Sequence, residues 1–163
     1  MKYFAYGSNM NRAEMQQRCQ GVVAIGNFQL KGFRLAFKYH ADIIPAEGCV
    51  VHGALWEITA DHEDVLDAYE SYPNYYGKYQ QDDVMFYRMK AGDTNALATP
   101  SKSYLKTIIQ GYHDFGLTQA EFEASLGVQQ YGLARSDLEA SLGVSTDELA
   151  RLFSHVATAP IYE

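Results

Sequence analysis

The sequence predicts an α+β protein in which a strand-rich part is followed by a helical part. Up to about residue 90, short segments rich in β-branched and aromatic residues alternate with Gly, Pro and Asn, which is typical of strands. Beyond Pro100, apolar residues recur at helical spacing. No linker separates the two parts, and 163 residues suit one core. We expect residues 1–116 to form the main body and residues 117–163 a helical extension packed on the same domain.

Local patterns place the individual elements of the main body. The expected strands are residues 2–6, 22–30, 34–39, 49–58, 76–80 and 84–89. The expected helices are residues 12–18 after a cap at Asn11, residues 61–69 after a cap at Thr59 or Asp61, and residues 101–115. On the second helix, Val65, Leu66 and Tyr69 are the expected inner face. The expected solvated face comprises Asp61, Glu63, Asp64 and Asp67.

The extension contains a near-repeat, in which residues 123–128 recur as residues 139–144. Two units are too few for a solenoid. Gly127 and Gly143 suit the position just after a helix, where a left-handed backbone is needed. Three S/T-x-x-E capping boxes predict three short helices: Thr118 with Glu121, Ser136 with Glu139, and Ser145 with Glu148.

Composition and charge exclude several function classes. The formal net charge of −7 disfavours nucleic acid and anionic membranes as partners. No apolar run approaches the roughly 20 residues of a membrane span, and the first residues lack a signal-peptide pattern. Cys19 and Cys49 stand alone without motif spacing, as expected for reduced core thiols. We therefore expect a cytoplasmic protein.

Motifs for metal, phosphate and serine chemistry are absent from the sequence. The five histidines show no ligand spacing, and neither G-x-S-x-G nor a P-loop occurs. We expect no metal and no cofactor. The 13 tyrosines suit either a polar-edged pocket or an ordinary tyrosine-rich sheet, and composition leaves both interpretations open.

Two local features could carry chemistry. The first strand ends in Gly7-Ser8-Asn9, and such a turn can gather backbone N–H groups into a concavity that binds an anion or a developing oxyanion. A plain strand-terminating turn is the alternative. Glu70 lies about 40° round the helix from Leu66, at the edge of the apolar stripe. Desolvation there can raise the pKa of a carboxyl group and suit it to acid/base work.

Several segments, in order along the chain, resemble the γ-glutamyl cyclotransferase (AIG2-like) family. They are Tyr3-Phe4-Ala5-Tyr6-Gly7-Ser8-Asn9-Met10, residues 30–37, residues 51–56, and Leu66-Asp67-Ala68-Tyr69-Glu70 with the tyrosines that follow. Residues 86–89 and 103–105 match more loosely, so the resemblance covers residues 1 to about 115. Ser71 stands where many members have Gly, and the hairpin between Tyr79 and Val84 is short.

The resemblance implies a fold, a reaction and a set of site residues. The fold is a mixed, barrel-like β-sheet with flanking helices around a cleft. The reaction is release of 5-oxoproline and a free amine from a γ-glutamyl amide, without a cofactor, by a lyase or acyltransferase mechanism. Glu70 would be the catalytic acid/base. The implied substrate-binding residues are Tyr6, Gly7, Ser8, Asn9, Met10, Tyr75, Tyr76 and Tyr87.

Two alternative functions remain beside this enzyme. One is a catalytically silent member of the fold that binds small amino-acid derivatives. The other is DNA binding, because residues 126–129 and 142–145 look like the turn of a helix-turn-helix. Residues 117–163 hold two arginines against seven carboxylates, a net charge of −5 that opposes phosphate binding. We therefore expect the extension to serve packing or homo-oligomer formation.

Overall fold

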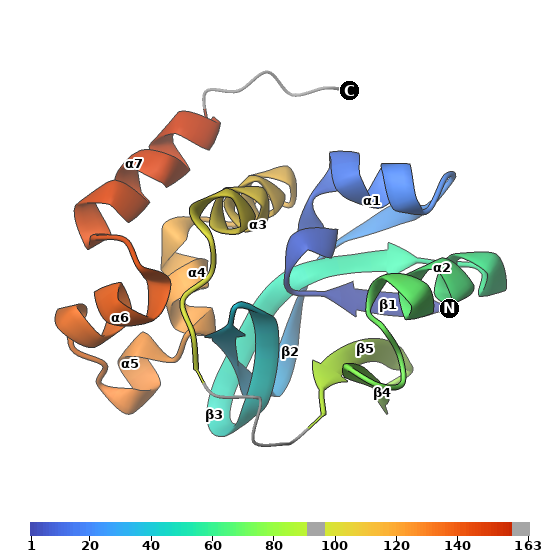
Figure 1. The fold of residues 1–163 in the computed structure, drawn as a ribbon, viewed down its shortest axis with the longest axis horizontal. Coiled ribbons are helices and arrows are strands. Elements are labelled where there is room, and N and C mark those ends of the chain that lie inside the picture. Colours follow the sequence, from blue (N-terminus) through green and yellow to red (C-terminus); the bar gives the residue numbers. More distant parts are fainter. Residues whose placement is uncertain (91–96, 158–163) are drawn as a thin grey trace.

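A five-stranded mixed sheet forms the centre of the computed structural model, which describes residues 1–90 and 97–157 (Figure 1). The strands are β1 (Lys2–Ala5), β2 (Val23–Lys38), β3 (His40–Glu57), β4 (Tyr76–Gln81) and β5 (Val84–Met89). Their order across the sheet is β2-β3-β1-β5-β4. The central strand β1 runs antiparallel to β3 and parallel to β5. The α+β class is confirmed, although this sheet stays open where a barrel-like form was expected.

Strands β2 and β3 form one long hairpin where three shorter strands were expected. The register shifts between Ala24 and Gly26 and again between Lys31 and Phe33. Gly32 takes a φ of +88° at the second shift, a conformation that glycine adopts readily. Residues 40–48, expected as a loop, pair with the end of β2 after a turn at Tyr39. Bulges interrupt the alternation of side chains, so one bent strand resembles two in the sequence.

The helices of the main body are the 3₁₀ helix η1 (Ser8–Met10), α1 (Arg12–Arg18), α2 (Ala60–Tyr69) and α3 (Lys102–Asp114). Helix α1 begins after the expected cap Asn11, and α2 begins after Thr59, one of the two expected caps. The side chain of Asn11 accepts from the N–H of Glu14, and that of Thr59 accepts from His62. The expected inner face of α2 was wrong in part: Leu66 is fully buried, whereas Val65 and Tyr69 are more than 40% exposed. Leu66, in the middle of this short helix, is its one buried residue.

The described part of the extension, residues 117–157, contains four helices where three were expected. They are α4 (Gln119–Ser125), α5 (Val128–Tyr131), α6 (Arg135–Leu142) and α7 (Thr146–Ala157). The box of Thr118 is formed, and Ser145 caps α7 through the N–H of Glu148. The box at Ser136 was wrong, because the cap of α6 is Ala134, two residues earlier, and Glu139 accepts instead from the N–H of Thr146. Gly127 and Gly143 have the expected left-handed backbone.

One continuous hydrophobic core joins the extension to the main body. Helix α3 lies between the sheet and α7 (Figure 1). The Phe153 ring of α7 approaches Tyr112 of α3 and Phe122 of α4, with centroids 6.3 and 5.7 Å away. The apolar stripe of α7 is thus used within the chain. Among the described helices, none has the length and apolar character needed to cross a membrane.

Candidate active site

The loop after β1 is anchored by its last residue, Met10. The side chain of Met10 is fully buried, and its Cβ lies against Gly111 of α3. A Cβ added at Gly111 would come within 2.5 Å of the Met10 Cβ, so glycine permits this close approach of α3 to the loop. The Met10 N–H donates to the carbonyl of Gly7 over 3.0 Å. Met10 therefore fixes the loop and, unlike the other sequence candidates, does not line the pocket described below.

The remaining amides of the loop are free for a ligand. Within residues 1–90 and 97–157, the N–H groups of Gly7, Ser8 and Asn9 have no hydrogen-bond partner in the protein. The first donors of a 3₁₀ turn have no carbonyl to reach within the turn, which explains why they are left over. The carbonyl of Asn9 accepts from the indole of buried Trp56 over 3.0 Å, which holds the loop's backbone against the core.

Glu70 ends α2 and places its carboxyl group beside this loop. The residue is half-buried, and its Oε1 accepts from the side-chain amide of Asn9 over 3.4 Å. Burial raises the pKa of Glu70 to about 7, and the positive charge of Arg18 opposes part of the rise. A carboxyl group with this pKa exchanges a proton readily near neutral pH.

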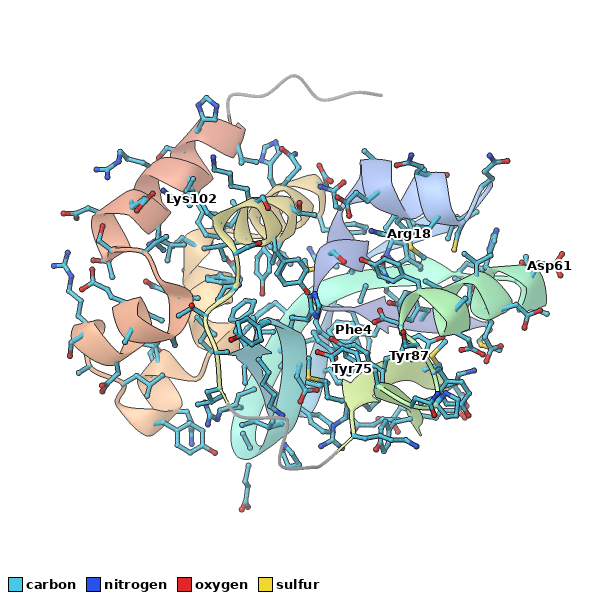
Figure 2. All side chains as sticks on the ribbon, in the orientation of Figure 1. Phe4, Arg18, Asp61, Tyr75, Tyr87 and Lys102 are labelled. Atoms are coloured by element: carbon cyan, nitrogen blue, oxygen red, sulfur yellow. The ribbon has the colours of Figure 1, made fainter. Side chains whose placement is uncertain are left out.

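A pocket of about 230 Å³ contains the carboxyl group of Glu70 and the loop. Of the nine sequence candidates, eight line it: Tyr6, Gly7, Ser8, Asn9, Glu70, Tyr75, Tyr76 and Tyr87. It is also lined by residues that the sequence did not single out for the site: Tyr3, Phe4, His40, Ala41, Tyr69, Ser71 and Tyr104. In Figure 2, the labelled residues Phe4 of β1, Tyr75 and Tyr87 of β5 lie close together. The pocket is thus rich in tyrosine hydroxyl groups.

The turn of the long hairpin forms one wall of the pocket. The backbone of Ala41 is held on both sides by tyrosines: its N–H donates to the Tyr104 hydroxyl over 3.0 Å, and its carbonyl accepts from Tyr76 over 2.8 Å. The buried carboxylate of Asp42 pairs with Lys38 at 2.7 Å and accepts from a backbone N–H of β5. No sequence signal marked this wall, because it depends on pairing between distant segments.

Charged residues of α2 support the part of the pocket around Tyr87. The hydroxyl of Tyr87 donates to Asp67 over 2.6 Å, and Lys78 bridges Asp67 and Glu63. Asp67 and Glu63 are half-buried and paired, so their expected place on a solvated face was wrong; β4 covers that side of the helix through Lys78. Asp61 instead projects from the far end of α2 (Figure 2). Burial and the Asp67 carboxylate raise the pKa of Tyr87, which keeps its hydroxyl neutral.

The site combines the titratable carboxyl group of Glu70 with free backbone N–H groups, tyrosine hydroxyl groups and the imidazole of His40. In the part of the chain that the structure describes, no group of three or more His, Cys, Asp or Glu side chains is arranged to hold a metal ion. The arrangement can move one proton at Glu70 and donate hydrogen bonds to an anion or a polarised carbonyl beside it.

Fold and site together define a small α+β domain with a glutamate in a tyrosine-lined pocket, and comparison with known proteins names its family. The model of the family "Gamma-glutamyl cyclotransferase, AIG2-like" matches residues 3–105. The chain therefore belongs to the γ-glutamyl cyclotransferase, AIG2-like family, and the resemblance seen in its motifs is confirmed. A comparison with curated proteins finds no match.

Solved structures share the fold. A structure described as γ-glutamyl cyclotransferase has a TM-score of 0.63 at 24% identity, over 75% of this chain and 83% of its own. An uncharacterized protein of Homo sapiens, loc79017, has a TM-score of 0.61 at 24% identity over the same shares. YkqA of Bacillus subtilis has a TM-score of 0.62 at 20% identity, over 80% of this chain and 53% of its own. At these identities the likeness shows the fold.

Proposed function

We propose that this protein is an active γ-glutamyl cyclotransferase that releases 5-oxoproline and a free amine from a γ-glutamyl amide. The observation that carries the proposal is the position of Glu70, whose carboxyl group, with a pKa raised to about 7, lies in a pocket beside unpaired loop amides. Membership of the family supports the same reaction class.

The proposed reaction needs only the groups that line this pocket. Glu70 in its ionised form takes a proton from the substrate's α-ammonium group. The freed nitrogen attacks the γ-carbonyl carbon of the same molecule, which closes a five-membered ring. Because the attack is intramolecular, holding the substrate in the bent conformation supplies much of the acceleration. The amides of residues 7–9 would stabilise the oxyanion that develops on the carbonyl oxygen.

Collapse of the tetrahedral intermediate completes the cycle. The carbon–nitrogen bond of the original amide breaks, and Glu70 returns its proton to the leaving nitrogen. The ring nitrogen loses its second proton to the released amine, so the products are 5-oxoproline and the amine in its ammonium form, and Glu70 is ionised again. A carboxyl pKa near neutrality suits both halves of this cycle, because the group must accept and then donate the same proton.

A panel of γ-glutamyl amides tests the proposal directly. The purified protein should form 5-oxoproline, detected by mass spectrometry, and kcat/KM should fall as the pH drops below about 7, where Glu70 becomes protonated. Glu70→Gln cannot exchange a proton and should lose about 10²-fold or more in rate. Turnover of the Gln variant within a few-fold of wild type would refute the role of Glu70. Binding without turnover would instead favour the catalytically silent alternative.

We further propose that the extension is a structural element rather than a nucleic-acid interface. Arg135 is engaged by Glu139 and Asp147, which leaves little positive charge on α6 and α7 to meet a phosphate backbone. The packing of Phe153 against α3 and α4 supports the same interpretation.

A further inference from the structure

Arg18, at the end of α1, lies behind the pocket and contacts two residues that line it. Its Nη1 donates to the Oδ1 of Asn9 over 2.7 Å, and its Nη2 donates to the hydroxyl of Tyr69 over 2.9 Å. The guanidinium carbon also lies 3.9 Å from the centre of the Tyr69 ring. Glu14, one turn earlier on the helix, accepts from Nη2 over 2.9 Å and holds the guanidinium in place. Arg18 itself is absent from the pocket lining.

The bond from Arg18 decides which way the side-chain amide of Asn9 faces. An amide group has one acceptor end and one donor end. Arginine only donates, so the Asn9 oxygen must face Arg18 and the Asn9 NH₂ must face the pocket. There the NH₂ reaches Oε1 of Glu70 at 3.4 Å and the hydroxyl of Tyr3 at 3.0 Å. If the amide turned over, its oxygen would face the carboxylate and repel it.

The second bond from Arg18 reaches the loop by another route. The Tyr69 hydroxyl that accepts from Arg18 is 2.9 Å from the Oγ of Ser8. The guanidinium of Arg18 is therefore linked to two consecutive residues of the loop. It bonds to Asn9 directly and reaches Ser8 through the hydroxyl of Tyr69. The planar guanidinium fork holds both bonds in a fixed geometry, whereas a lysine ammonium on a flexible stem would hold them less rigidly.

We propose that Arg18 is a positioning residue. It sets the orientation of the Asn9 amide and thereby the hydrogen bond that Asn9 donates to the Glu70 carboxylate. The proposal rests on the function proposed above, with Glu70 as the proton carrier. Arg18 has two separable effects: its fork orients Asn9 and Tyr69, and its charge favours the ionised form of Glu70.

Other titratable groups around Glu70 do not duplicate this charge. Besides His40 of β3, which lines the same pocket, those that face it from neighbouring elements are tyrosines: Tyr3, Tyr6, Tyr75, Tyr76, Tyr87 and Tyr104. Burial raises the pKa of each of these hydroxyl groups, so they are neutral when Glu70 titrates. Among the described residues, Arg18 is the one cation that acts on the Glu70 carboxyl group.

Two substitutions separate the fork from the charge. Arg18→Gln removes both, so the Glu70 pKa should rise. The pH at which kcat/KM falls on the acid side of its profile should rise by the same amount as the Glu70 pKa. The rate loss relative to wild type should be several-fold larger at pH 6 than at pH 8.5. Arg18→Lys keeps the charge and loses the fork, so the pH at which its kcat/KM falls should rise by less than in Arg18→Gln, and its kcat/KM should be lower at every pH. Arg12→Gln is the matched control from the same helix, since Arg12 lies 4.5 Å over the Phe115 ring outside the pocket.

A titration without substrate keeps this inference distinct from the proposed function. The carboxyl carbon of Glu70, followed by NMR in protein labelled with ¹³C-glutamate, should titrate higher in Arg18→Gln than in wild type and unchanged in Arg12→Gln. An unchanged Glu70 titration in a folded Arg18→Gln protein would overturn the inference even if the enzyme is active. Conversely, a titration that shifts in Arg18→Gln and, by a smaller amount, in Arg18→Lys would uphold it in a protein that turns over no γ-glutamyl amide, while the proposed function fails.

Discussion

Replacing Glu70 with Gln should stabilise the protein above pH 7 while abolishing its chemistry. The folded state holds the Glu70 carboxyl group in a desolvated position that raises its pKa from 4.5 to about 7. Between these two pH values the folded protein keeps a proton that the unfolded chain has lost, so wild-type stability falls as the pH rises through this window. A glutamine is neutral at every pH and has no such cost.

The size of the effect follows from the same shift. At about 1.4 kcal/mol for each pH unit, a rise from 4.5 to about 7 corresponds to about 3 kcal/mol of lost stability. The difference in unfolding free energy between Glu70→Gln and wild type should therefore grow by up to about 3 kcal/mol from pH 4.5 to pH 7.5 and stay level above it. Other titrating groups act equally on both proteins and cancel in the difference.

Urea unfolding followed by circular dichroism at several pH values measures this difference. Glu47→Gln is a suitable control, because Glu47 is an exposed glutamate of β3 and its removal should produce no gap of that size. A difference between Glu70→Gln and wild type that is the same at pH 5 and pH 8 would refute the claim that Glu70 is desolvated in the folded protein. The proposal for its acid/base role would then lose its physical basis.

Two further predictions concern the loop and the extension. A crystal grown with formate or sulfate should hold the anion against the amides of residues 7–9, near Glu70, because these donors have no protein partner. If these amides bound no anion in a crystal grown at high anion concentration, the result would argue against an anion-binding loop. The double variant Arg135→Glu, Arg151→Glu should form 5-oxoproline at the wild-type rate, and wild type should not shift mixed DNA duplexes in a low-salt gel. Robust DNA binding lost in the double variant would make the helix-turn-helix interpretation the leading one for the extension.

Local sequence rules determined the parts of this protein that depend on neighbours in the chain. The caps at Asn11 and Thr59 and the left-handed glycines 127 and 143 were all predicted, because each depends on a few consecutive residues. The loop after β1 and the position of Glu70 at the end of its helix were predicted for the same reason. Membership of the family followed from motifs in order along the chain.

Tertiary structure alone decided what surrounds those motifs. The wall built on Ala41 exists because hydroxyls from β4 and α3 hold a peptide of the long hairpin, and no local pattern encodes such a meeting. Met10 was expected to bind substrate, but it lies outside the pocket because its side chain packs against α3 at Gly111. Asp67 was expected in solvent because helical periodicity gives the bearing of a side chain and not the strand that covers it. Desolvation of Glu70 and its hydrogen bond to Asn9 arise from the same long-range packing. The chemistry of the site therefore depends on contacts between residues far apart in the chain, which local sequence patterns do not predict.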